Sequence, residues 1–171
     1  MLNRLRVKSM YWLYNILLLM YWASLIPVLI YRLIHEEGFY QRIKQSIGFL
    51  PDELKKKISD RHAIWVHAAS VGEIVAASPI VREMRKEHPQ EVIIVSVVTA
   101  TGFRMAHQII DGAVGILYFP LDLPYLTGRI LNIVNPKIIV LVETEIWPNF
   151  LRIANRKKIP IMMMNGRISQ R

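Results

Sequence analysis

A glutamate stands where an apolar stretch of the chain gives way to an amphipathic one, in Ile64-Trp65-Val66-His67-Ala68-Ala69-Ser70-Val71-Gly72-Glu73. The first part is typical of a buried strand, and the part after Ser70 is typical of the first turns of a helix. Ligands of open α/β sheets bind beyond the carboxyl ends of the strands. Glu73 is therefore a candidate general base for a substrate hydroxyl, and Gly72 leaves room for another group to approach.

The same residues also fit a purely structural role. Ser70 and Glu73 have the S-x-x-E spacing of a capping box, in which both side chains bind free backbone N–H groups at a helix start. The sequence leaves both roles open for Glu73. We interpret His67, at the end of the strand, as a core histidine rather than a catalyst.

Polar residues follow three further strand-like runs. Glu143 and Glu145 come after Ile138–Val142 and are expected at the same sheet edge as Glu73, unless they serve only the next helix start. Thr99, Thr101 and Gly102 follow Val92–Val98, where they either hold a phosphate or sugar oxygen or form a plain N-cap. Asn165 and Arg167 follow the last run, and Arg167 is a candidate partner for an anionic group.

Apolar strands that alternate with helices must position these residues. The pattern predicts an α/β fold, a Rossmann-like parallel sheet with helices on both faces, over residues 62–171. The predicted strands are 63–67, 92–98, 115–119, 138–142 and 160–164, and the predicted helices are 72–88, 102–110, 123–134 and 147–157. The sequence has no G-x-G-x-x-G after the first strand, no P-loop, no H-E-x-x-H and no cysteine. We therefore expect neither a cofactor nor a metal centre.

The N-terminal part of the chain points to a membrane. No charged residue occurs from Ser9 to Tyr31, and about 20 apolar residues suffice to cross a bilayer. We predict a membrane-anchor helix in residues 1–34, kinked at Pro27. A helix lying in the membrane interface and a buried core helix are the alternatives.

The net charge of +9 favours anionic partners. Residues 35–61 form a basic connector, which is either a solvated linker or a surface that rests on anionic lipid. The basic residues are not interleaved with aromatic ones in the way that stacking on bases requires, so we expect no nucleic-acid partner.

Five motifs together resemble those of the 3-deoxy-D-manno-octulosonic acid (Kdo) transferases of lipopolysaccharide synthesis. They are His67–Glu73, Thr99–Gly102, Pro120–Pro124, Glu143–Asn149 and Asn165–Ser169. Ala100 and Gly166 depart from residues that are common in that family. The resemblance implies the N-terminal domain of a GT-B glycosyltransferase, held at the cytoplasmic face of the inner membrane.

The resemblance also implies a reaction and roles. Such enzymes transfer Kdo from CMP-Kdo to the lipid A precursor (lipid IVA), with inversion and without an essential metal. Glu73 matches the family's proposed base, and Glu143 matches a carboxylate that supports the transition state. The remaining polar motif residues are expected to contact substrate: Ser70, Gly72, Thr99, Thr101, Gly102, Glu145, Asn165 and Arg167.

A polar stretch directly after the last strand is an abrupt place for a domain to end. We interpret the chain as the acceptor-side half of a two-domain enzyme, whose other half binds the nucleotide, and we do not expect it to be active alone. The alternative function is a non-catalytic, membrane-tethered binding module for an anionic glycolipid.

Overall fold

The computed structural model describes residues 2–143 and 145–164, with side chains described from residue 9 onward. The chain divides into two compact units, Met1–Gln41 and Arg42–Arg171.

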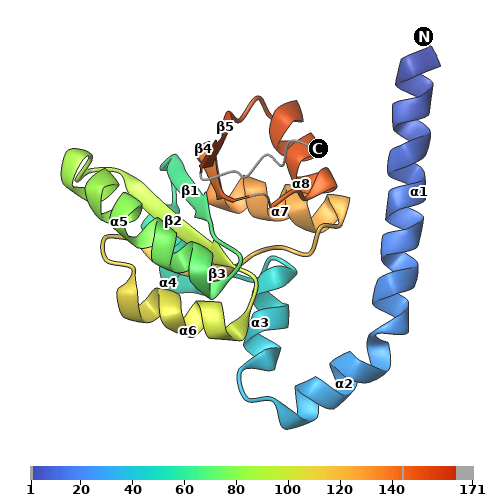
Figure 1. Ribbon diagram of the computed structural model, residues 1–171, viewed down its shortest axis with the longest axis horizontal. Helices are drawn as coiled ribbons and strands as arrows, with labels where there is room; N and C mark the ends of the chain where they lie inside the picture. The colour runs from blue at the N-terminus through green and yellow to red at the C-terminus, as the bar shows by residue number, and fades with distance from the viewer. Residues whose placement is uncertain (1, 144, 165–171) are drawn as a thin grey trace, which may run out of the picture. The chain divides into compact units, whose positions relative to one another are not determined.

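The second unit alternates strands and helices, as Figure 1 shows. Its strands are β1 (Ala63–His67), β2 (Val92–Val97), β3 (Gly115–Tyr118), β4 (Pro136–Val142) and β5 (Ile161–Met164), and the helices that connect them are α5 (Val71–Glu87), α6 (Ala100–Ile109), α7 (Pro124–Val134) and α8 (Pro148–Arg156). All strand pairs are parallel, in the order β3-β2-β1-β4-β5. The prediction of an α/β fold with a parallel sheet is confirmed, and every element begins and ends within two residues of its predicted bounds.

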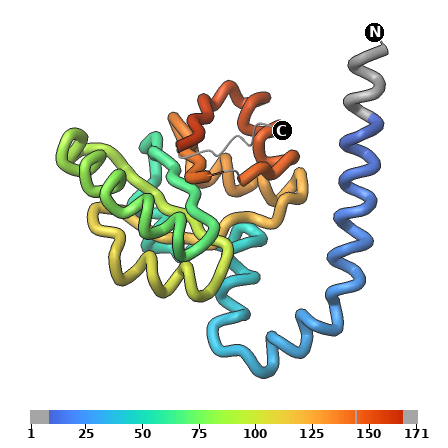
Figure 2. The backbone as a smooth tube through the Cα atoms, viewed as in Figure 1, coloured from blue at the N-terminus to red at the C-terminus, as the bar shows by residue number. Residues whose placement is uncertain are grey.

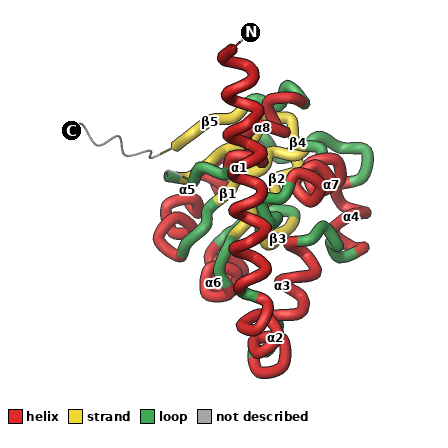
Figure 3. The backbone as a smooth tube through the Cα atoms, turned by 90° about the vertical axis from the view of Figure 1, so that its right-hand side faces the viewer, coloured by secondary structure: helices red, strands yellow, loops and turns green. Residues whose placement is uncertain are grey.

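The sheet has a separate apolar core on each face because successive strand residues point to opposite sides. Trp65, Ile139 and Leu141 pack on the face covered by α7 and α8. Val66 and Val140 pack on the face covered by α5 and α6. The elements on the two sides can be followed in the second view of the molecule (Figure 3). Helices on both faces leave only the edges and ends of the strands for a ligand.

The predicted connector contains two helices, α3 (Phe39–Ser46) and α4 (Asp52–Ile58). Leu54 and Ile58 of α4 are buried in the core beneath the sheet. The end of α3 is bound to the end of β3, since Gln45 Oε1 accepts a hydrogen bond from the Tyr118 N–H at 3.1 Å. Most of this stretch therefore belongs to the folded sheet unit, although its surface is basic.

The N-terminal apolar segment forms two helices, α1 (Leu2–Ser24) and α2 (Ile26–His35), visible in the backbone trace of Figure 2. The predicted kink is present as a break at Leu25, two residues before Pro27, where the two helices are bent by 48°. Membrane attachment of this segment stays a prediction. Pro27 lies in the first turn of α2 and has no N–H to donate to the preceding turn. No single helix among the described residues is long and apolar enough to cross a membrane, whereas the bent pair passes by length and composition only.

His67 lies in the core, as its sequence position suggested. The side chain is fully buried, stacks on the Phe119 ring with 4.0 Å between centroids, and has Nδ1 2.9 Å from Ser96 Oγ. The Trp65 indole N–H donates to the same hydroxyl. Burial lowers the pKa of His67 to about 3, although the hydrogen bond with the Ser96 backbone opposes this. The imidazole is therefore neutral near pH 7.

We predict that this histidine makes the fold sensitive to acid. Between pH 6.5 and about 3 the unfolded chain binds a proton at residue 67 that the folded chain excludes, so stability falls as the pH falls. The contribution is about 2 kcal/mol between pH 7 and pH 5. Urea unfolding of His67→Gln at both pH values should show a correspondingly smaller pH dependence. His62→Gln, at an exposed position, should keep the pH dependence of the parent, and an equal change in both variants would contradict the assignment.

Candidate active site

The carboxyl ends of the three central strands meet at one edge of the sheet. His67 at the end of β1 pairs with Ser96 of β2 on one side and with Leu141 of β4 on the other. The chain after β1 stays close to the chain after β2, because the Val98 N–H donates to the Ala69 carbonyl at 3.3 Å. The loops that carry Glu73, Thr99 and Glu143 therefore leave the sheet side by side.

Glu73 is held by hydrogen bonds at the start of α5. Its Oε1 accepts from the Ser70 hydroxyl at 2.8 Å, and its Oε2 accepts from the Ala69 N–H at 2.7 Å. The Ser70 hydroxyl oxygen also accepts a hydrogen bond from the Glu73 N–H at 3.4 Å, which completes a reciprocal cap. Glu73 thus caps the start of α5, and the hydrogen bonds of the cap fix the position of both carboxylate oxygens.

Glu73 remains next to the surface. Its exposed fraction is only 6%, but its partner Ser70 and the neighbouring Gly72 are exposed. A Cβ atom at Gly72 would meet nothing within 4 Å. The space at the Cβ position of Gly72, next to Glu73 in the sequence, is therefore open.

The loop after β2 forms the N-terminus of α6. Thr99 Oγ1 accepts a hydrogen bond from the Gly102 N–H at 3.0 Å, and the exposed Thr101 hydroxyl lies 3.2 Å from Thr99 Oγ1. A Cβ atom at Gly102 would lie 2.9 Å from Thr99 Oγ1 and 3.6 Å from the Ala69 carbonyl oxygen. A glycine at this position therefore leaves room for the Thr99 hydroxyl that caps α6, whereas the contact of a Cβ atom with Ala69 would be an ordinary one.

Glu143 and Glu145 follow β4 in an unusual backbone conformation. Glu143 has a φ of 64°, in the left-handed region that side chains other than glycine rarely adopt. Its N–H donates to the Met164 carbonyl at 2.8 Å, which binds the turn to the end of β5. Glu145 Oε2 accepts from the Trp147 indole N–H at 3.0 Å. Strain of this kind is concentrated at functional sites.

The pKa of Glu145 depends on the two other carboxylates that follow these strands. Burial raises the pKa of Glu145, and the negative charges of Glu73 and Glu143 raise it further, against the hydrogen bond from Trp147. Like charges act in this way only over short distances. We refer to Glu73, Glu143 and Glu145, which follow the adjacent strands β1 and β4, as the acidic site.

Asp122 is a buried polar residue that we did not predict for this edge. It lies in the Pro120–Pro124 motif, is 2% exposed, and binds the start of α8. A clue was present in the sequence, because Trp147 cannot cap a helix and Pro148 follows it directly.

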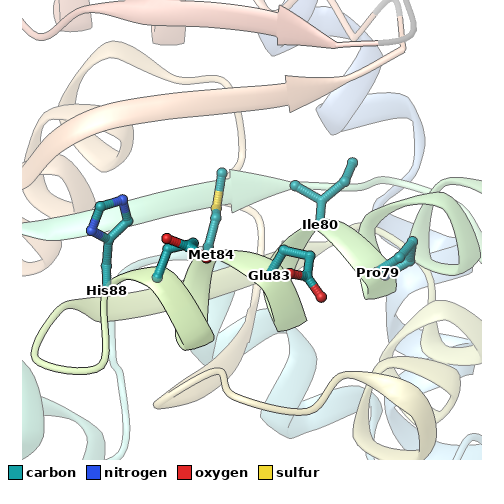
Figure 4. A pocket seen from close by; sticks show the side chains of 6 residues that line it. Pro79, Ile80, Glu83, Met84 and His88 are labelled. Atoms are coloured by element: carbon teal, nitrogen blue, oxygen red, sulfur yellow. The ribbon is translucent and has the colours of Figure 1, made fainter.

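The remaining predicted site residues, Asn165 and Arg167, lie outside the described residues. Within the described part of the chain, no group of three or more histidine, aspartate or glutamate side chains is arranged to hold a metal ion. One described pocket lies along α5, lined by Pro79, Ile80, Glu83, Met84, Glu87 and His88 (Figure 4), and another lies along α7. Neither is lined by a predicted site residue.

Comparison with known proteins connects this geometry to a family. Residues 41–171 match the profile of the family described as 3-deoxy-D-manno-octulosonic-acid transferase (kdotransferase). The 3-deoxy-D-manno-octulosonic acid transferase of Haemophilus influenzae is 35% identical over 133 residues, covering 78% of this chain and 30% of the relative. That of Chlamydophila psittaci is 26% identical over 171 residues, covering 99% of this chain and 39% of the relative.

A bifunctional glycosyltransferase/methyltransferase of Fusobacterium nucleatum is 36% identical over 116 residues, which are 67% of this chain and 18% of the relative. The chain thus spans between 18% and 39% of the length of these three relatives. The family profile covers both strand ends that carry the acidic site. The chain therefore belongs to the Kdo transferase family.

Proposed function

We propose that this chain forms the acceptor-side half of a GT-B enzyme that transfers Kdo from CMP-Kdo to the lipid A precursor (lipid IVA). The observation that carries the proposal is the acidic site formed by Glu73, Glu143 and Glu145 at the ends of adjacent strands. CMP-Kdo is bound mainly by the part of the relatives' length that this chain does not span. Family membership supports the reaction type.

Glu73 acts as the general base. A sugar hydroxyl of the acceptor attacks the anomeric carbon of Kdo, CMP leaves with the electron pair of the broken C–O bond, and the hydroxyl proton passes to Glu73. A base must be aligned with the proton that it takes, and the bonds from Ala69 and Ser70 supply that alignment. The proposed acceptor approaches over the open space at Gly72.

Glu143 and Glu145 stabilise charge. Glycosyl transfer passes through a transition state with oxocarbenium character, in which positive charge develops on the sugar. Fixed carboxylates at that point favour the transition state over the ground state. Thr99, Thr101 and Gly102 contact the polar groups of the substrates at the start of α6, and we assign the same task to Asn165 and Arg167.

The first unit attaches the enzyme to the cytoplasmic face of the inner membrane. α2 has no buried residue, and large apolar side chains of both helices are exposed, among them Trp12, Leu13, Leu17 and Met20. Exposed apolar surface of this extent is typical of a membrane contact. The bend at Leu25 leaves open whether the pair spans the bilayer or lies in its interface.

We predict that Glu73→Gln in the full-length enzyme lowers kcat by about 10²–10⁴-fold, the usual effect of a general base. The amide keeps one acceptor oxygen, so the start of α5 should remain folded. Glu83→Gln, on the exposed surface of the same helix, is the matched control and should retain full transfer. Near-normal transfer by Glu73→Gln would contradict the assignment, and loss of the fold would favour the capping role alone.

We predict opposite shifts of the Glu145 pKa in two variants. Glu73→Gln removes a negative charge that raises this pKa, so the pKa should fall. Trp147→Phe removes a hydrogen bond that lowers it, so the pKa should rise. NMR titration of carboxyl-labelled glutamate measures both shifts. Shifts of the same sign in the two variants would contradict the placement of Glu73 and Trp147 beside Glu145.

We predict that a charge on α1 weakens membrane binding. Leu17→Lys places a charged group in the apolar segment, which costs about 3 kcal/mol at the centre of a membrane helix and lowers binding about 10²-fold. Sedimentation with phosphatidylcholine vesicles measures the effect. Ser59→Lys adds the same charge to an exposed position of the second unit and should bind as the parent does. Equal binding of all three proteins to the vesicles would contradict the proposal that α1 attaches the chain to the membrane.

A further inference from the structure

The start of α8 has no cap of its own. Trp147 occupies the N-cap position without a side-chain hydrogen bond, and Pro148 follows in the first turn. The next two residues, Asn149 and Phe150, are almost fully buried. Their N–H groups therefore need partners from another part of the chain, because water does not reach them.

Asp122 provides both partners from the loop between β3 and α7. Its Oδ2 accepts the Asn149 N–H at 3.0 Å, and its Oδ1 accepts the Phe150 N–H at 2.8 Å. The Asn149 side-chain amide in turn donates to the Asp122 carbonyl at 2.5 Å. A carboxylate is also favoured there by the helix dipole. Three hydrogen bonds thus join two loops that are far apart in the sequence.

These bonds fix one end of the segment that carries two of the three acidic side chains. Residues 143–147 run from β4 to α8, and the N–H of Glu143 is bound to β5 at the other end. Trp147 donates to Glu145 and packs on Phe119, just before the Pro120–Pro124 motif, with 5.4 Å between ring centroids. The position of Glu145 is consequently coupled, through Trp147, to the start of α8, which Asp122 binds.

We propose that Asp122 is a positioning residue for Kdo transfer, which holds Glu145 in place through the start of α8 and Trp147. The inference rests on the proposed function of that carboxylate. Asp122 itself is buried and acts through the backbone of Asn149 and Phe150 rather than on the substrate. Its loss should therefore impair the chemical step more than substrate binding.

The test is Asp122→Asn in the full-length enzyme, which replaces one acceptor oxygen by an amide that faces the backbone N–H groups. Hydrogen exchange of peptides covering residues 143–151 should become at least tenfold faster. The kcat of Kdo transfer should fall at least tenfold, with the KM for CMP-Kdo changed less than threefold. The matched control is Ser78→Ala, which removes a buried hydrogen bond to the Ile109 carbonyl on the other face of the sheet. It should lower the melting temperature but leave kcat and the exchange of residues 143–151 unchanged.

Two results with Asp122→Asn would overturn the proposal. Unchanged exchange in Asp122→Asn would show that Asp122 does not hold the segment, and faster exchange with unchanged kcat would reduce Asp122 to a helix cap. If Asp122→Asn fails to fold, Asn149→Ala removes the side-chain bond to the Asp122 carbonyl and keeps the two backbone bonds to the Asp122 carboxylate. It should give smaller changes in the same directions, and no change in either readout would overturn the proposal. If the parent enzyme shows no Kdo transfer, the proposed function is refuted. The hydrogen-exchange measurement would still decide whether Asp122 holds the segment.

Discussion

The structure depends on how backbone N–H groups are satisfied where helices begin at one edge of the sheet. α5, α6 and α8 all start beside the carboxyl ends of β1, β2 and β4. Each start leaves donors without a partner inside the helix, and oxygen-bearing side chains bind them: Ser70 for α5, Thr99 for α6 and Asp122 for α8. The requirement for caps thus concentrates acceptors at the edge where a parallel sheet also binds ligands.

A cap and a catalytic group therefore need not be alternatives at Glu73. The hydrogen bonds that complete the cap keep its carboxylate in a single orientation, and a base benefits from a fixed orientation. Ser70 remains exposed although it takes part in the cap. The fold can thus stabilise the start of α5 and present a carboxylate to a substrate with the same four residues.

How well the sequence predicted each feature depends on how far apart the interacting residues lie in the sequence. The strands and helices were predictable because the near-continuous apolar runs of β1 and β2 and the S-x-x-E cap of α5 are local signals. The bend at Leu25 was only partly predictable, since Pro27 indicated a kink but not two separate helices. The burial of Leu54 and the contacts of Asp122 were missed because they join residues distant in sequence. The sequence did predict Glu73 and Glu145 at the same end of the sheet, but only the order of the strands shows that they follow adjacent strands.

Repulsion among the carboxylates of the acidic site raises the free energy of the folded protein when no substrate is bound. In the proposed mechanism, the relief of this repulsion assists transfer. Burial raises the pKa of Glu145, and the charges of Glu73 and Glu143 raise it further, so the ionised carboxylates repel one another. In the proposed reaction, positive charge that develops at the anomeric carbon in the transition state relieves this repulsion, whereas the ground-state sugar carries no positive charge and does not. An interaction that strengthens between ground state and transition state accelerates a reaction, whereas uniform binding does not. The repulsion, together with the strained turn at Glu143, is therefore consistent with a site selected for transition-state binding rather than for stability.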